Sequence, residues 1–255
     1  MERFADRRVL ITGAGSGIGR ATVHRILSEG GTVVAADISS AGLAETAKQA
    51  GAGEAERLTS VTIDIADEDS VRAGVASALE TLGGLDALVN AAGILRSAHT
   101  HELSLADWNQ VIATNLTGTF LMSRESLPAL LDSGRGVIVN FASTSAYFAH
   151  PYMAAYAASK GGIMSMTHAL AVEYAKQGLR AVAVAPGSIS TDMTTGRGPG
   201  LPEDSDWALF GKLMPLLGDG FADPGVVAGV VAMLASDDGA FITGTEIRID
   251  GGTHA

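Results

Sequence analysis

Short runs of apolar residues alternate along this chain with stretches whose apolar residues recur at helical spacing. Parallel strands that are buried on both faces have mostly unbroken runs of valine, isoleucine and alanine, and the intervening helices cover the sheet. The alternation therefore predicts a doubly wound α/β fold, with a parallel seven-stranded sheet, helices on both faces and ligands at the carboxyl ends of the strands. The expected strands are residues 8–12, 32–37, 60–64, 86–90, 136–143, 180–186 and 246–250. Helical spacing is clearest over residues 17–29, 67–81, 104–132 and 152–177.

Length and composition limit the number of domains and the kinds of partner. A chain of 255 residues with 47% apolar and 18% charged residues can bury one large core, and no linker divides it, so we expect a single domain over residues 1–255. The net charge of −11 argues against binding to nucleic acid or to anionic membranes. The longest apolar run, residues 225–235, is too short to span a bilayer, and the first residues lack the apolar segment of a signal peptide. We therefore expect a soluble, cytoplasmic protein.

The cysteine and histidine content excludes further kinds of chemistry. The chain has no cysteine, which rules out disulfides and thiolate catalysis and leaves only histidine and carboxylate ligands for zinc. The six histidines do not cluster beyond "HTH" at residues 99–101, a sequence more typical of a polar loop. We expect no metal site.

A glycine-rich segment, "TGAGSGIG" at residues 12–19, joins the first expected strand to the first expected helix. Glycines permit a tight turn and let the backbone approach a pyrophosphate, whose charge is favoured by the N–H groups at the start of a helix. The common G-x-G-x-x-G pattern is not met, because Ile18 stands at its third glycine, and the pattern present is T-G-x-x-x-G-x-G. Such a loop by itself indicates only a tight turn. Its place between a strand and a helix favours a dinucleotide site.

Asp37 ends the second expected strand, 18 residues after Gly19. A carboxylate at this place can accept hydrogen bonds from both hydroxyls of an adenine ribose. An aspartate at a strand end is also commonly a cap or a turn former. The glycine loop at the right distance favours the cofactor interpretation.

One tyrosine has a lysine at the spacing that favours its phenolate. A free phenol has a pKa of about 10, and a cation one helical turn away lowers that pKa because residues i and i+4 share a helix face. Of the four tyrosines, only Tyr156 has a lysine four positions later, Lys160. Such a pair on an exposed face is usually only solvated. The spacing nevertheless makes Tyr156 the best candidate for proton transfer.

These motifs occur in an order that resembles the short-chain dehydrogenase/reductase family, from about residue 5 to residue 253. The supporting segments are "TGAGSGIG" at 12–19, Asp64 at the end of the third strand, "NAAG" at 90–93, Asn115 in "VIATNLTG", Ser143 in "VNFAS", "YAASK" at 156–160 and "PGSIST" at 186–191. No single segment is decisive, but their joint order is specific. The resemblance implies a Rossmann-type fold and an oxidoreductase.

The resemblance also implies a role for each of four residues. Tyr156 would be the general acid/base, and Ser143 would hydrogen-bond the substrate oxygen. Lys160 would bind the nicotinamide ribose and would lower the pKa of Tyr156 together with the positive nicotinamide ring. Asn115 would hold the lysine through a water molecule.

The expected cofactor is NAD, and the family pattern places its binding site along most of the chain. The expected contacts are Gly13, Ser16, Gly17, Ile18, Gly19, Asp37, Asp64, Ile65, Asn90, Ala91, Gly93, Tyr156, Lys160, Pro186, Gly187, Ile189 and Thr191. NADP is disfavoured because Asp37 would repel a 2′-phosphate. Ser16 and Ile38 stand where NADP-binding relatives usually have a basic residue. The nearest arginine, Arg20, could in principle reach the site.

The resemblance therefore predicts a homotetrameric NAD-dependent oxidoreductase that transfers a hydride between a secondary alcohol, or its ketone, and the nicotinamide. The expected substrate pocket comprises Ser145, Tyr152, Met193 and Trp207, under a substrate lid at about residues 192–222. Apolar residues in that lid favour an apolar or alicyclic substrate. Two alternatives remain, a 3-oxoacyl thioester reductase and a catalytically silent dinucleotide-binding protein. The complete set of four residues argues against the silent protein.

Overall fold

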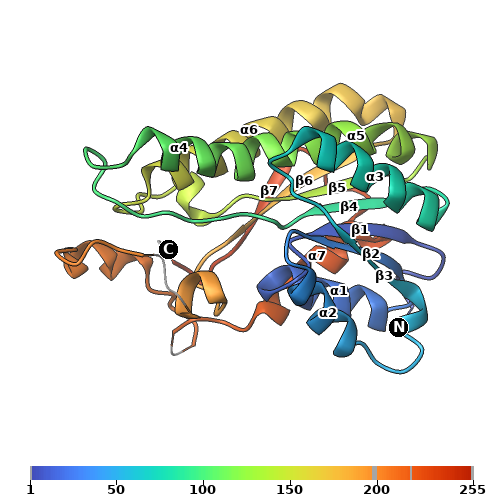
Figure 1. Ribbon diagram of the computed structural model, residues 1–255, viewed down its shortest axis with the longest axis horizontal. Helices are drawn as coiled ribbons and strands as arrows, with labels where there is room; N and C mark the ends of the chain where they lie inside the picture. The colour runs from blue at the N-terminus through green and yellow to red at the C-terminus, as the bar shows by residue number, and fades with distance from the viewer. Residues whose placement is uncertain (1, 197–199, 219, 254–255) are drawn as a thin grey trace.

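Seven strands form one parallel sheet in the computed structural model, which describes residues 2–196, 200–218 and 220–253 (Figure 1). The strand order is β3-β2-β1-β4-β5-β6-β7, so the chain winds outward from β1 in both directions. The strands are β1 Arg8–Thr12, β2 Thr32–Asp37, β3 Leu58–Thr62, β4 Ala87–Asn90, β5 Val137–Phe141, β6 Arg180–Pro186 and β7 Thr245–Ile249. The helices are α1 Gly17–Ser28, α2 Ser40–Lys48, α3 Glu68–Leu82, α4 Leu105–Ile112, α5 Gly118–Asp132, α6 Ala154–Tyr174 and α7 Pro224–Ala235.

Helices cover both faces of the sheet, with α1, α2 and α7 on one side and α3 to α6 on the other (Figure 1). Successive side chains of a strand point to opposite faces. Val9 and Ile11 of β1 accordingly join the core beneath α1 and α7, whereas Leu10 joins the core beneath α3 and α5. All three side chains are fully buried. The unbroken apolar runs in the sequence follow from this burial on both faces, and the doubly wound fold is confirmed.

The third strand begins and ends two residues earlier than expected. It pairs with β2 from Leu58 opposite Val33 to Thr62 opposite Asp37, and the sheet pairing stops there. Asp64 therefore lies two residues beyond the strand, and the expectation that it ends β3 is wrong. Its Oδ1 accepts a hydrogen bond from Ala66 N at 2.9 Å, so its side chain shapes the turn toward α3.

Two of the expected helices have irregular backbone at positions that matter for the site. The helix expected over 104–132 contains a π-helical turn, Ala113–Thr117, between α4 and α5. The helix expected from residue 152 begins at Ala154. Tyr152 has a φ of 65°, which lies in the left-handed region and excludes it from a right-handed helix.

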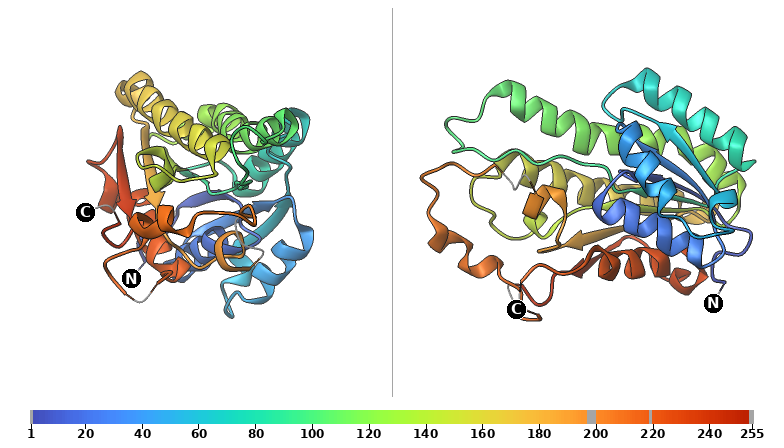
Figure 2. Two further views of the ribbon diagram at one scale, coloured as in Figure 1. Left: turned by 90° about the vertical axis from the view of Figure 1, so that its left-hand side faces the viewer. Right: turned by 60° about the horizontal axis from the view of Figure 1, so that its bottom comes forward.

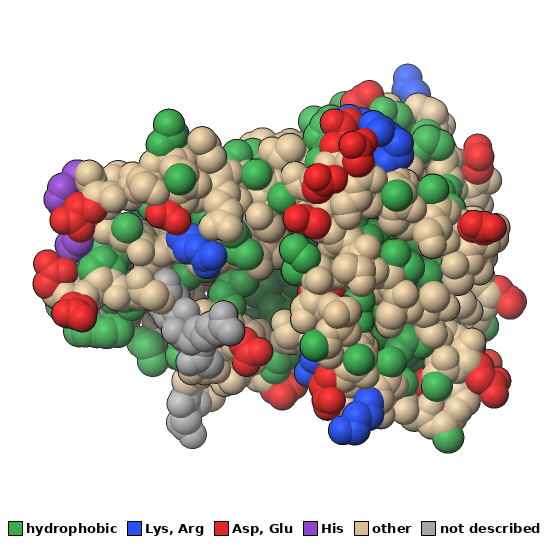
Figure 3. All heavy atoms as spheres, in the orientation of Figure 1, with side chains coloured by type: hydrophobic (Ala, Val, Ile, Leu, Met, Phe, Trp, Pro, Cys, Tyr) green, Lys and Arg blue, Asp and Glu red, His purple; other side chains and the backbone are tan. Residues whose placement is uncertain are grey.

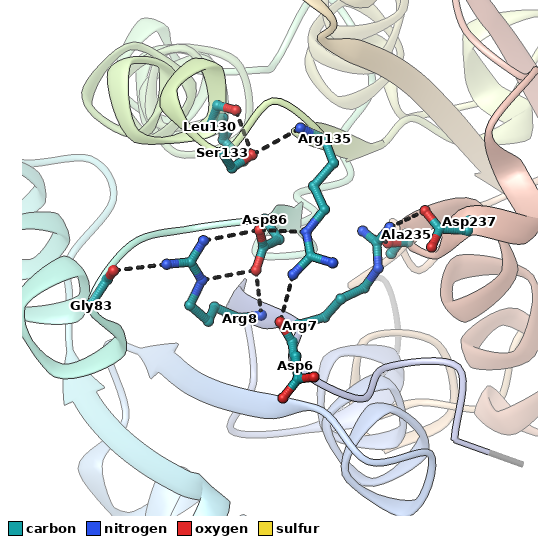
Figure 4. Close-up of polar contacts among 10 residues, drawn as sticks. All are labelled: Asp6, Arg7, Arg8, Gly83, Asp86, Leu130, Ser133, Arg135, Ala235 and Asp237. Atoms are coloured by element: carbon teal, nitrogen blue, oxygen red, sulfur yellow. Dashed lines mark hydrogen bonds and ion pairs between the residues drawn. The ribbon is translucent and has the colours of Figure 1, made fainter.

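Charged side chains are paired at the amino ends of the strands (Figure 4). Asp86, just before β4, accepts hydrogen bonds from Arg8 Nε at 2.9 Å, Arg8 Nη2 at 3.0 Å and Arg135 Nε at 3.0 Å. The buried Arg7 side chain forms an ion pair with Asp237. Burial raises the pKa of Asp86, but Arg8 and Arg135 together lower it to about 2.

The described residues between β6 and α7 run along the end of the molecule beside the loops that follow β4 and β5 (Figures 1 and 2). Residues 197–199 and 219 of the expected lid lie outside the described residues. Within the described part of the chain, no helix is long and apolar enough to cross a membrane.

Candidate active site

A cavity of about 520 Å³ lies at the carboxyl ends of the strands, and Figure 3 shows this side of the molecule hollowed near its centre. Its walls come from the segments that follow β1, β2, β3, β4, β5 and β6, together with α4 and α6. In a doubly wound sheet, ligands bind at this place. The expected site residues that line it are Gly13, Ser16, Gly17, Ile18, Gly19, Asp37, Asp64, Ile65, Ala91, Gly93, Ser143, Tyr156, Lys160, Pro186, Gly187, Ile189, Thr191 and Met193.

The glycine loop is shaped by close backbone contacts. Gly13 has a φ of 67°, and a Cβ there would lie 2.7 Å from Ala92 N. A Cβ on Gly19 would lie 2.0 Å from the Gly13 carbonyl oxygen, so no larger residue fits at either position. The Ser16 side chain makes no capping hydrogen bond to a described residue at the start of α1. The N–H groups of the first helical turn therefore face the cavity region free to bind an anion.

The Asp37 carboxylate is fixed at the rim of the cavity by two backbone amides. Its Oδ2 accepts from Gly15 N at 2.9 Å and its Oδ1 accepts from Ser39 N at 2.8 Å. Each oxygen keeps a lone pair for a further donor. Arg20 does not share this position, because it donates to Thr46 Oγ1 at 2.9 Å and to the Gly15 carbonyl. Lys160 is the only cationic side chain among the described residues that line the cavity.

Ser143, Tyr156 and Lys160 meet on one wall of the cavity. Ser143 follows β5, whereas Tyr156 and Lys160 lie one turn apart at the start of α6. Burial raises the pKa of Tyr156 above its ordinary value, and a hydrogen bond with Ser143 opposes part of this rise. Burial also lowers the pKa of Lys160 to about 8.

The ammonium of Lys160 points past the tyrosine ring rather than at its hydroxyl. Its Nζ donates to the Phe141 carbonyl oxygen at 2.6 Å and lies 5.5 Å from the centre of the Tyr156 ring. In the protein without cofactor, the hydrogen bond with Ser143 lowers the pKa of Tyr156, whereas Lys160 is not among the groups that shift it.

Asn115 lies behind the cavity wall, in the π-helical turn, and is fully buried. Its Oδ1 accepts from Ile94 N at 2.8 Å, and its Nδ2 donates to Ile94 O at 2.9 Å and to Ser159 Oγ at 3.1 Å. It thus fixes the segment after β4 and contacts α6 next to Lys160, although its side chain has no direct bond to the lysine. Single π-helical turns frequently occur at functional sites.

Besides Asn115, four of the expected site residues do not line the cavity. The Asn90 side chain is buried and donates to Asn140 Oδ1 at 2.9 Å and to Ser123 Oγ at 3.2 Å. Ser145 is buried beyond Ser143. Tyr152 and Trp207 contact residues of the 192–222 segment instead. The sequence placed these residues near the correct strand ends, but the direction of a side chain leaving a loop cannot be obtained from spacing.

Other residues line the cavity that the sequence analysis did not predict as site residues. These residues are Ala36, Ile38, Ile63, Ala66, Ala92, Ile94, Gln110, Ala113, Thr114, Phe141, Ala142, Asp192 and Thr194. Most are small or apolar neighbours of predicted residues and carry no chemical signal. Gln110 and Thr114 could have been found, because they are one turn apart in the helical stretch expected over residues 104–132, just before Asn115.

The doubly wound sheet, the glycine loop and the uncapped start of α1 together define a dinucleotide-binding protein. The chain belongs to the short-chain dehydrogenase family, whose model matches residues 7–201. Its cofactor is accordingly a nicotinamide dinucleotide, and the close-packed glycines and the anion-binding helix start fit that group.

Similar proteins span nearly the whole chain. The 3-oxoacyl-(acyl-carrier-protein) reductase FabG of Thermotoga maritima is 38% identical over 250 residues, 98% of each chain. Levodione reductase of Leifsonia aquatica is 38% identical over 258 residues, 99% of this chain and 96% of that protein. The crystal structure of 3-ketoacyl-(acyl-carrier-protein) reductase from Brucella melitensis complexed with NADH superposes with a TM-score of 0.86 at 32% identity, covering 98% of this chain and 99% of the other. The protein is therefore an oxidoreductase of the short-chain dehydrogenase family.

Proposed function

We propose that the protein transfers a hydride between NAD and a secondary alcohol or its ketone, with Tyr156 as the general acid/base. The observation that carries the proposal is that Ser143, Tyr156 and Lys160 line the same cavity as the glycine loop and Asp37. Bound NAD⁺ supplies the hydride acceptor and a positively charged ring. The chain acts as one domain, in which residues 192–222 form the substrate lid.

Tyr156 and Ser143 act on the substrate oxygen. The Tyr156 phenolate takes the proton of the substrate alcohol in oxidation, and the Tyr156 hydroxyl returns that proton in reduction, while Ser143 donates a hydrogen bond to the same substrate oxygen. The hydrogen bond between the two side chains fixes the tyrosine before substrate arrives. Burial opposes the phenolate, so positive charge from the cofactor end of the cavity is needed to bring the pKa of Tyr156 toward neutrality.

Lys160 holds a proton at the inner end of the cavity. Its pKa of about 8 keeps it mostly protonated at neutral pH. One N–H of the ammonium is used on the Phe141 carbonyl, and the other two are free to bind the hydroxyls of a ribose. Asn115 keeps the segment after β4 and the start of α6 in register for this contact.

Asp37 selects NAD over NADP in this proposal. Its carboxylate stands at the cavity rim, where a 2′-phosphate would meet like charge. Two observations support the choice: Arg20 is held by Thr46 and by backbone carbonyls, and Ile38 is 65% exposed without offering a charge. The Brucella melitensis relative complexed with NADH is consistent with it.

The substrate is an apolar or alicyclic secondary alcohol. Ile94, Ala142 and Met193 give the cavity an apolar wall, and Lys160 is the only cation among its described lining residues, so an anionic substrate finds no free partner there. The 38% identity with a levodione reductase supports the same class. The equal identity with the Thermotoga maritima protein favours a second candidate, a 3-oxoacyl thioester reductase.

A panel of cyclic alcohols, hydroxysteroids, small hydroxy acids and 3-hydroxyacyl thioesters, assayed by the absorbance of NADH, separates these candidates. The proposal predicts the highest kcat/KM for a cyclic alcohol. Preference for a 3-hydroxyacyl thioester would establish the second candidate, and preference for a charged hydroxy acid would contradict both. NADH binding without turnover of any substrate would indicate a catalytically silent protein.

A further inference from the structure

Two polar contacts attach the 192–222 segment to the loops that follow β4 and β5. The Tyr152 hydroxyl, before α6, accepts a hydrogen bond from Asp206 N at 2.9 Å. His99 Nε2, after β4, lies 2.9 Å from Asp204 Oδ1. Figures 1 and 2 show the three segments side by side at this end of the molecule. Both contacts are made by one three-residue stretch of the 192–222 segment, from Asp204 to Asp206.

Aromatic packing joins the same residues. The Tyr152 ring meets the His99 ring edge-on, with 5.1 Å between centroids, and stacks on Phe210 of the lid at 6.1 Å. Phe210 in turn packs on Trp207 at 5.4 Å. Aromatic pairs at such separations add to the energy of burial. Tyr152 therefore lies at the centre of a cluster drawn from three segments.

The backbone of Tyr152 has a strained, left-handed conformation, and the contacts of its side chain hold it there. With Asp6, it is one of two non-glycine residues with positive φ in the described part of the chain. The Tyr152 carbonyl accepts from Ala98 N at 2.9 Å, which ties the two loops together at this point. A bulky residue in this conformation persists only where its surroundings fix it, and such positions are concentrated at functional sites.

We propose that Tyr152 and His99 are positioning residues that dock the lid onto the body of the protein and thereby set its affinity for substrate. Neither side chain lines the cavity, so each acts through the lid, whose residue Met193 does line it. The effect on substrate affinity rests on the proposed function, whereas the docking of the lid does not. Loss of docking raises the substrate KM and leaves NAD binding and the chemical step unchanged.

The docking depends on pH through His99. The hydrogen bond with Asp204 raises the pKa of His99, and the same bond lowers the pKa of Asp204. Glu102 and the His101 ring, at 5.7 Å, also face it from its own loop, and Tyr152 faces it from the loop before α6. The imidazolium is paired with Asp204 at low pH. The charge of the pair is lost as the pH rises through the raised pKa of His99.

Hydrogen exchange tests the docking without reference to activity. In Tyr152→Phe, the Asp206 amide loses its acceptor, and the amides of residues 203–213 are expected to exchange about fivefold faster, as for the loss of one neutral hydrogen bond. The matched control is Tyr147→Phe, which removes a hydroxyl that is buried without a hydrogen-bond partner among the described residues. Unchanged exchange in a folded Tyr152→Phe protein overturns the proposal. Asp204→Asn, which keeps the shape of the contact, is the second variant and is expected to give the same direction.

Trp207 reports on the pH dependence. In a Trp108→Phe background it is the remaining tryptophan, and its fluorescence is expected to titrate with the raised pKa of His99. The titration is expected to disappear in His99→Gln, and its persistence there overturns the role of His99.

Steady-state kinetics then connect docking to substrate. Tyr152→Phe is expected to raise the substrate KM about fivefold at unchanged kcat and unchanged NADH affinity. A raised KM with unchanged hydrogen exchange would instead mean that Tyr152 contacts the substrate, and it overturns the proposal. If no substrate turns over, the exchange and fluorescence results still decide the docking.

Discussion

The two ends of the parallel sheet hold buried charge in opposite ways. At the amino end, the fully buried Asp86 carboxylate receives hydrogen bonds from two arginines, and its pKa falls to about 2 (Figure 4). At the carboxyl end, Lys160 is 4% exposed and its ammonium donates to one carbonyl, and burial lowers its pKa to about 8. The first shift stabilises the charged form and the second destabilises it. Lys160, unlike Asp86, lines the cavity, and a desolvated titratable group in a cleft is a mark of a functional site.

The largest expected effect is the loss of turnover in Tyr156→Phe. Removal of the hydroxyl takes away the proposed general acid/base and is expected to lower kcat by at least about 100-fold, with NADH affinity nearly unchanged. Tyr174→Phe, at the far end of α6, is the control and should keep full turnover. Substantial activity in a folded Tyr156→Phe protein would assign the proton transfer to another group.

The next prediction concerns the stability of variants at the two ends of the sheet. Asp86→Asn leaves Arg8 and Arg135 without their carboxylate, and since both are partly exposed the expected loss is about 2–4 kcal/mol in the free energy of unfolding. Lys160→Met removes an uncompensated buried charge and is expected to be at least as stable as the unmodified protein. Urea unfolding followed by circular dichroism measures both. A larger loss for Lys160→Met would reverse the comparison.

The Asp86 carboxylate and the Lys160 ammonium should change the free energy of unfolding over different pH ranges. The Asp86 pKa falls from 3.8 to about 2 on folding, so its contribution is present above the ordinary value and is lost as the pH drops through the folded one. The Lys160 pKa falls from 10.5 to about 8, so its penalty is present below the folded value and is relieved as the pH rises to the ordinary one. We expect about 2 kcal/mol for Asp86 and about 3 kcal/mol for Lys160.

Differences in unfolding free energy between the unmodified protein and each variant, measured against pH, test these windows. The Asp86→Asn difference should change in the acid window alone and the Lys160→Met difference in the alkaline window alone. If both differences changed over the same pH range, neither pKa shift would belong to the residue to which it is assigned.

The smallest expected effect concerns the rim of the cavity at the end of β2. Asp37→Ala combined with Ile38→Arg exchanges a repulsive charge for an attractive one beside a 2′-phosphate. The ratio of kcat/KM for NADP to that for NAD is expected to rise about 10- to 100-fold, or about 1–3 kcal/mol. Ile38→Arg alone is the control and should give a smaller change. No change in the ratio for the double variant would remove Asp37 from cofactor selection.

The sequence predicted the carboxyl end of the sheet better than the amino end, for a physical reason. Buried strands need unbroken apolar runs and a phosphate site needs glycines, so β1, β2 and the loop from Gly13 to Gly19 could be placed from local patterns alone. The Asp86 network joins charges that are far apart in the sequence, and nothing local distinguishes them from solvated residues. The π-helical turn at Asn115 and the positive φ of Tyr152 depend on tertiary contacts. The sequence therefore could not show that the Tyr152 side chain contacts Asp206 and Phe210 rather than the cavity.

The central claim is that the carboxyl end of the sheet is an NAD-dependent oxidoreductase site. The most direct measurement is kcat/KM for NAD⁺ and for NADP⁺ on the unmodified protein, with the best secondary alcohol of the panel. The account predicts alcohol-dependent reduction of NAD⁺ at a kcat/KM at least about tenfold above that for NADP⁺. Equal values, a preference for NADP⁺, or binding of NADH without reduction of either cofactor would contradict it.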